Sequence, residues 1–241
     1  MIIDFHAHII PRADHGCESS AMALAQLQLM AKNGTEEVVA TPHFYPNQDR
    51  VSGFLRARDG AIEAMLHKLP MHELPTVYPA AEVLVCEGID TMEGLEKLTV
   101  AGTNVILLEM PFVRWSDDLI RSVLGVRERG LTPVMAHVDR YLKSDVDMLL
   151  AEGLFAQLNA ESFGLFGTAK RYVPLIEKGQ VVALGSDLHG ARSGDYHRFV
   201  KVQKKLGKLA DILFDSTASL LAGATPITAP KPAPEREKTL V

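Results

Sequence analysis

The stretch "IIDFHAH", residues 2–8, is an apolar run that is interrupted only by Asp4 before it reaches two histidines. An apolar run of this length is typical of a buried strand. Side chains two apart on a strand lie on the same face, so His6 and His8 project to the same place. Two neighbouring buried imidazoles need a shared partner, and a metal ion is the usual one. The pair alone leaves both a metal site and hydrogen-bonded core histidines open.

Similar apolar runs recur along the chain and are separated by amphipathic stretches. We expect strands at Ile2–His8, Glu37–His43, Thr76–Val83, Asn104–Glu109, Thr132–His137, Phe155–Asn159 and Val181–Ser186. We expect helices at Ser19–Asn33, Arg50–Leu69, Asp117–Arg129, Asp145–Glu152, Thr168–Lys178, Tyr196–Leu206 and Lys208–Leu221. Strand–helix alternation with apolar strands predicts a parallel sheet in an α/β fold. Seven units favour a (β/α) barrel one strand short of the eight-stranded form, with a doubly wound open sheet as the alternative.

Length and composition predict one domain and limit its partners. The 241 residues are 47% hydrophobic and 23% charged, with a net charge of −5 and no basic run that would indicate nucleic-acid binding. We expect one domain over residues 1–222 and a disordered tail over residues 223–241, where "PITAPKPAPEREKTLV" lacks periodicity. The two cysteines cannot form a disulfide framework, and no stretch reads as a signal peptide or membrane span. We therefore expect a cytoplasmic protein.

Ionisable residues stand where the predicted strands end. In parallel α/β folds these carboxyl ends meet at one edge, which is where functional groups collect. Six of the seven strands supply His, Asp or Glu there, and one more imidazole follows the first strand. The candidate metal ligands are His6, His8, His15, His43, Glu82, Glu109, His137, Asp187 and His189. Because each buried ionisable group is costly when unpaired, this distribution is far more specific than any single motif.

This donor set indicates the metal and the chemistry. Six histidines and three carboxylates are more than one tetrahedral ion needs, so we predict two or three divalent ions. Imidazole and carboxylate donors without a thiolate suit zinc, manganese or iron. Such a cluster suits phosphoester hydrolysis by a metal-bound hydroxide. Cysteine-dependent phosphatase chemistry is not expected, because no arginine follows Cys17 or Cys86 at the sixth position.

The motifs "DFHAH", "ATPH", "AAE", "LLEMP", "AHVDRY" and "GSDLH" follow the order of the PHP (polymerase and histidinol phosphatase) superfamily of metallo-phosphoesterases, which the chain resembles over about residues 1–222. Within it, "VVATPHFYPN", "PVMAHVDRY" and "QLNAESF" resemble the bacterial manganese-dependent protein-tyrosine phosphatases of capsule and exopolysaccharide operons. The resemblance implies a distorted seven-stranded barrel that holds three metal ions, most typically manganese. It also implies that the substrate is a phosphotyrosine protein, the tail of a bacterial tyrosine autokinase.

The resemblance also assigns roles to single residues. It implies one metal held by His6, His8, Glu82 and Asp187, a second held by Glu82, Glu109 and His137, and a third held by His15, His43 and His189. The phosphatases usually read "DDG" where this chain has Asp14-His15-Gly16, and other PHP members use histidine at the second position. Arg140 and Arg192 correspond to the phosphate-binding arginines. Asp14 is either a partner of a metal ligand or a turn residue, and we favour the turn. We assign Asp139 and Tyr141 no role beyond packing.

Three other functions stay open at this point. A PHP phosphatase of a small ester, such as a histidinol-phosphate-like metabolite, would use the same metal ligands. An amidohydrolase also begins with His-x-His, but it has no need of His43, Glu109 or His189 and usually has a bridging lysine, which is not found here. A non-catalytic regulator would use the metals only for structure and would have no open coordination position.

Overall fold

Strand β1 (Ile3–His8) is buried along its whole length, as its apolar sequence predicts. The structure, a computed structural model, describes residues 1–163, 171–191 and 193–227. Within them β1 belongs to a parallel sheet in the order β10–β1–β2–β4. Its other strands are β2 (Glu37–Ala40), β4 (Thr76–Pro79) and β10 (Leu188–His189).

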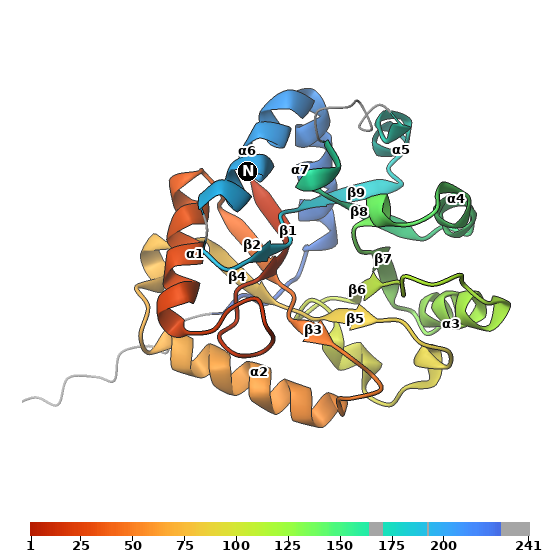
Figure 1. Ribbon diagram of the computed structural model, residues 1–241, viewed down its shortest axis with the longest axis horizontal. Coiled ribbons are helices and arrows are strands. Elements are labelled where there is room, and N and C mark those ends of the chain that lie inside the picture. The colour runs from red at the N-terminus through yellow and green to blue at the C-terminus, as the bar shows by residue number, and fades with distance from the viewer. Residues whose placement is uncertain (164–170, 192, 228–241) are drawn as a thin grey trace, which may run out of the picture.

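The second sheet is also parallel and has the order β3–β5–β6–β7–β8–β9. Its strands are β3 (His43–Phe44), β5 (Glu82–Leu84), β6 (Val105–Glu109), β7 (Thr132–Met135), β8 (Phe155–Asn159) and β9 (Val181–Gly185). Figure 1 shows the helices lying around the outside of the two sheets. The α/β class and the parallel pairing are therefore confirmed.

The predicted number of strands is wrong. The single strands expected at 37–43 and 76–83 are each divided in two, β2 with β3 and β4 with β5, and β10 was not predicted. One break falls at Pro42, which has no amide proton for a ladder. The other lies beside it in space, because Ala80 N donates to Ala40 O at 2.9 Å and Glu82 N donates to Pro42 O at 3.0 Å. The β2–β3 segment and the β4–β5 segment thus pass side by side from the first sheet to the second.

The two sheets also approach each other at β1 and β9, where the described residues form no ladder that would close a barrel. Asp187 N donates to His6 O at 2.8 Å just beyond β9. A Cβ at Gly185 would lie 2.6 Å from the Cβ of His6. Only glycine therefore allows β9 to lie this close to β1.

The predicted helices are found with small shifts of their ends. They are α1 (Ser20–Lys32), α2 (Val51–Leu66), α3 (Asp117–Glu128), α4 (Lys143–Ala151), α6 (Ser193–Leu206) and α7 (Lys208–Leu220). Ser19 caps α1 by accepting from Met22 N at 3.2 Å. Part of the helix expected at 168–178 lies outside the described residues, and α5 (Val173–Glu177) is the part that is described.

Short 3₁₀ helices, none of which was predicted, complete the described elements. They are η1 (Met71–Glu73), η2 (Ile89–Thr91), η3 (Leu95–Leu98), η4 (Val138–Arg140) and η5 (Ala160–Phe163). Most of the predicted tail, residues 228–241, lies outside the described residues. Before it, Thr225 N donates to Ala101 O and Ile227 N donates to Val77 O, both at 2.7 Å. Up to residue 227, none of the described helices is both long and apolar enough to cross a membrane.

Candidate metal centre

The nine predicted ligand residues lie together where the strands end. They come from β1 (His6, His8), the loop after it (His15), β3 (His43), β5 (Glu82), β6 (Glu109), the residue before η4 (His137), the β9–β10 link (Asp187) and β10 (His189). Seven of them line a cavity of about 540 Å³, and His6 and His8 lie buried beneath it. Arg140 lines the same cavity, whereas Arg192 lies outside the described residues.

Glu82 is the centre of this cluster. Its Oε2 lies 3.0 Å from His43 Nδ1, 3.3 Å from His6 Nε2 and 3.4 Å from His8 Nε2. Its Oε1 lies 2.8 Å from His137 Nε2. The Glu82 side chain is fully buried, and neither its Oε2 nor His43 Nδ1 has a hydrogen bond of normal geometry. Buried polar atoms without hydrogen bonds are costly, and a divalent cation between them would satisfy both.

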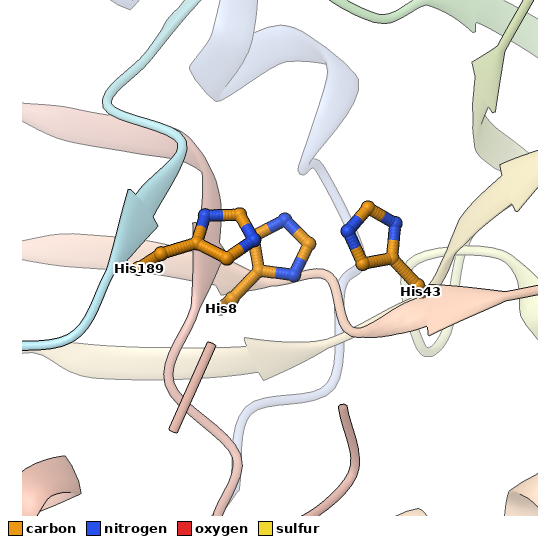
Figure 2. A group of neighbouring side chains, drawn as sticks. All are labelled: His8, His43 and His189. Carbon is orange, nitrogen blue, oxygen red and sulfur yellow. The ribbon is translucent and has the colours of Figure 1, made fainter. Parts of the chain in front are cut away.

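Among the described residues, three groups of donor atoms are close enough together to hold an ion. They are His6 with His8 and Asp187, His43 with Glu82 and Glu109, and His8 with His43 and His189, and in each group the ligand atoms lie within 4.8 Å of one another. Figure 2 shows the last group, with imidazoles from β10, β1 and β3 in a row. The exposed His15 ring lies 5.1 Å from the His43 ring and 4.7 Å from the His189 ring, centre to centre.

Burial and neighbouring charges shift the pKa values of several groups in the cluster. Burial opposes charge on Glu82, but the neighbouring His6 and the hydrogen bond with His137 outweigh it and hold the pKa of Glu82 well below its usual value. Burial likewise opposes a charge on His6, yet Glu82 and Asp187 raise its pKa. For His189, burial and the nearby His8 lower the pKa to about 4. His189 is therefore neutral near pH 7, which is the form that binds a metal.

Asp14 does more than form the predicted turn. Its Oδ1 accepts from Gly16 N at 2.8 Å, as a turn residue would. Its Oδ2 lies 2.5 Å from His8 Nδ1 and accepts from His43 N at 3.0 Å. This carboxylate therefore fixes the orientation of the His8 ring, with Nε2 toward the cluster. Asp14 therefore forms the favoured turn and also contacts a candidate ligand, which supports the alternative that it is a partner of a metal ligand.

Gln157, which was not predicted, and Tyr141, which was assigned to packing, hold the imidazoles in place. Gln157 Oε1 lies 3.3 Å from His6 Nδ1 and accepts from His137 N at 2.8 Å. The Tyr141 hydroxyl lies 3.2 Å from His137 Nδ1 and accepts from Met110 N at 3.0 Å, so its role is not packing alone. The sequence did contain one signal for Gln157. Gln157 and Asn159 are polar residues two apart at the end of an apolar strand. This strand is the one of the seven predicted strands that has no ionisable residue at its end.

Two of the candidate ligands have a strained backbone. His137 has φ of 32° and Asp187 has φ of 52°, the left-handed region that residues other than glycine rarely adopt. Such strain costs on the order of 1–3 kcal/mol and is common at functional sites. Asp187 is held by Arg140 Nη2 at 2.7 Å and by Asn159 Nδ2 at 2.9 Å, both on Oδ2, which leaves Oδ1 facing His6 and His8.

The Cys17 side chain is buried and does not line the cavity. Burial raises the pKa of the Cys17 thiol to about 11, and its Sγ donates to Ser19 O. This thiol is not an activated nucleophile, as the missing arginine predicts. The remaining cavity residues, Tyr45, Glu161, Ser186 and Leu188, were not predicted.

The chain is similar in sequence to known proteins. A family model described as capsular polysaccharide synthesis, CpsB/CapC, matches residues 2–221. The chain is 24% identical to the tyrosine-protein phosphatase YwqE of Bacillus subtilis over an alignment of 259 positions, covering 99% of this chain and 98% of YwqE. It is 24% identical over 213 residues to the tyrosine-protein phosphatase CpsB of Streptococcus pneumoniae, covering 80% and 84% of the two chains.

Solved structures share the fold. One described as YwqE from Bacillus subtilis and CpsB from Streptococcus pneumoniae, unique metal-dependent tyrosine phosphatases, superposes with a TM-score of 0.74 at 22% identity, covering 97% of this chain and 100% of that one. Histidinol phosphate phosphatase from Lactococcus lactis, complexed with zinc, L-histidinol and phosphate, superposes with a TM-score of 0.56 at 13% identity, covering 86% and 94%. The match of the family model over nearly the whole length shows that the chain belongs to the CpsB/CapC family of capsular polysaccharide synthesis.

Proposed function

We propose that this chain is a metal-dependent protein-tyrosine phosphatase of capsular or exopolysaccharide synthesis. The observation that carries the proposal is the Glu82 carboxylate, whose two oxygens lie within 2.8 to 3.4 Å of four imidazoles and whose Oε2 is buried without a hydrogen bond. The names of the relatives, tyrosine-protein phosphatases, support the choice of substrate. The catalytic domain is proposed to span residues 1–222.

The donor set fits two or three divalent ions. The ligands would be His6, His8, His15, His43, Glu82, Glu109, His137, Asp187 and His189. When bound, divalent ions supply positive charge for the phosphate oxygens and lower the pKa of a water molecule that attacks phosphorus. Manganese is the ion we propose, with iron or zinc as alternatives for the same imidazole and carboxylate donors.

The chain's own residues would orient the ligands and the substrate. Asp14, Gln157 and Tyr141 hold the imidazoles of His8, His6 and His137 by the hydrogen bonds described above. The Arg140 guanidinium lines the cavity and binds Asp187 through Nη2. Because a guanidinium has five N–H donors, Arg140 can keep this ion pair and still donate to a phosphate oxygen. Arg192 is proposed for the same role.

The proposed partner is a phosphotyrosine protein, the tail of a bacterial tyrosine autokinase that acts in polysaccharide export, in the cytoplasm. Hydrolysis of a small ester of the histidinol-phosphate type is the alternative. The likeness to histidinol phosphate phosphatase at 13% identity supports a shared fold and does not favour that substrate.

The test is turnover by the metal-stripped protein reloaded with manganese. We expect manganese-dependent hydrolysis of a phosphotyrosine peptide, a much slower reaction with histidinol phosphate, and loss of activity in His6→Ala. His67→Ala, which removes an exposed imidazole at the end of α2, is the matched control and should keep full activity. A preference for histidinol phosphate would favour the alternative, and no turnover of either ester by the reloaded protein would reject a phosphatase.

A further inference from the structure

An apolar groove of about 800 Å³ lies beside the metal cavity. In the part of the chain that the structure describes, six large hydrophobic side chains are exposed, and four of them line this groove. They are Phe112, Val113, Leu142 and Met148. Their exposed fractions run from 38% to 69%, so the apolar surface is open to solvent. A concentration of exposed apolar side chains in one place is typical of a binding surface.

The groove belongs to the edge of the sheet that holds the metal cavity. One wall follows β6 and the other follows β7, toward α3 and α4 in Figure 1. Arg140 lines both the groove and the metal cavity, so the two are adjacent. The Phe112 ring lies 6.4 Å from the ring of the candidate ligand His137, centre to centre.

The floor of the groove is already ordered. Trp115 Nε1 donates to Pro111 O at 3.1 Å, and its ring meets the Tyr141 ring edge-on at 5.4 Å. Tyr141 in turn holds His137 through its hydroxyl. An aromatic floor, apolar walls and a polar rim of Arg114, Ser144 and Asp145 are the usual parts of a side-chain recognition site.

We infer that this groove binds an apolar side chain that flanks the phosphotyrosine of a peptide substrate, an inference that rests on the proposed function. An extended peptide advances about 3.3 Å per residue, so the 6.4 Å between the ring centres of Phe112 and His137 corresponds to about two residues. A small phosphate ester would leave the groove empty. The groove therefore selects, among phosphotyrosine segments, those with a bulky apolar residue near the phosphorylated position.

The chain offers a direct readout of groove occupancy, because Trp115 is its single tryptophan. Two tryptophan-free phosphotyrosine peptides are compared, identical except for leucine or serine at the flanking positions. A phosphonate version of each peptide, which the enzyme cannot hydrolyse, is titrated into the manganese-loaded protein while Trp115 fluorescence is recorded. We expect the leucine peptide to change the fluorescence at a concentration about tenfold lower than the serine peptide, as burial of one apolar side chain predicts.

Kinetics with the manganese-loaded protein measure the same preference as a ratio of kcat/KM for the two peptides. The double variant Leu142→Gln with Met148→Gln keeps side-chain size and removes the apolar walls. We expect it to lose most of the tenfold preference. Ile212→Gln, a change of the same kind at an exposed position on α7 outside the groove, should keep the preference.

The outcomes separate this inference from the proposed function. Equal kcat/KM for both peptides without a change in Trp115 fluorescence would reject side-chain binding in the groove and would leave the proposed phosphatase activity unaffected. Selective binding of the leucine peptide without hydrolysis of any peptide or of phenyl phosphate supports the groove and rejects the phosphatase. A double variant that keeps the preference but no longer self-associates in sedimentation would make the groove a contact between two copies and overturn the inference.

Discussion

The Glu82 carboxylate faces imidazoles that come from β1, β3 and the segment after β7. Glu82→Gln keeps the size of the side chain and removes its charge, so the variant should bind fewer metal ions and lose at least about a hundredfold in kcat, as loss of an electrostatic contact to the reacting groups typically does. Metal content by mass spectrometry and phosphotyrosine turnover measure the two effects. Glu96→Gln, at an exposed glutamate paired with Arg129, is the control. Unchanged metal content in Glu82→Gln would contradict the proposed ligand set.

Asp4 offers a second test, through pH. Burial raises the pKa of this fully buried carboxyl from 3.8 to about 6, despite hydrogen bonds from Ser186 and His6. Because the pKa is higher in the folded chain, its stabilising contribution is complete below pH 3.8 and is lost as the pH rises through 6. Asp4→Asn stays neutral, so we expect it to gain roughly 3 kcal/mol of unfolding free energy relative to the parent between pH 4 and pH 7.

Urea denaturation of the metal-free proteins at several pH values measures this difference. Asp118→Asn, at an exposed carboxylate paired with Arg121 at the surface, is the control for loss of a charge. A difference between Asp4→Asn and the parent that stays constant from pH 4 to pH 7 would contradict the raised pKa. The hydrogen bonds to Asp4 Oδ1 can be kept by the asparagine oxygen.

Among the elements, β9 and β1 approach closely only because residue 185 is glycine. In Gly185→Ala the new Cβ would lie 2.6 Å from His6 Cβ and 2.5 Å from Gln157 Nε2. We expect a loss of about 1–3 kcal/mol of unfolding free energy from overpacking, together with weaker metal binding because His6 is displaced. In Gly60→Ala, inside α2, the new Cβ has no atom within 4 Å, and we expect a gain of up to about 1 kcal/mol. Thermal unfolding measures the Tm of both variants. A shift of the Tm in the same direction in Gly185→Ala and Gly60→Ala would contradict this account.

The elements themselves were largely predictable, because their signals are local. Ser19 and Ser116 begin α1 and α3 as caps, and apolar runs mark the strands. The switch between sheets at Pro42 was not predictable, because it depends on where β5 lies. The ionisable strand ends were visible in the sequence, whereas the contact of Gln157 with His6 joins residues 151 positions apart. Roles that depend on such distant packing, like those of Asp14 and Tyr141, appear only in the structure.

At the scale of the whole molecule, the donor groups connect the two sheets. His6, His8 and His189 belong to the first sheet, and His43 and Glu82 belong to the second. Bound ions would therefore stabilise the fold globally, by about 2.7 kcal/mol for each site when the free metal is a hundred times its Kd. Differential scanning calorimetry with added manganese should show a rise in Tm that a chelator reverses and that His6→Ala diminishes. A Tm that does not respond to manganese or the chelator would contradict this coupling.

Joining the two sheets through metal ligands also has a consequence for the lifetime of the protein in a cell. Degradation by proteases follows the fraction of chains that are open at any moment. Newly made chains in a metal-starved cell would open more often and be degraded sooner than the same chains in a metal-replete cell. The amount of enzyme would then follow the metal supply through protein turnover, at a constant rate of synthesis.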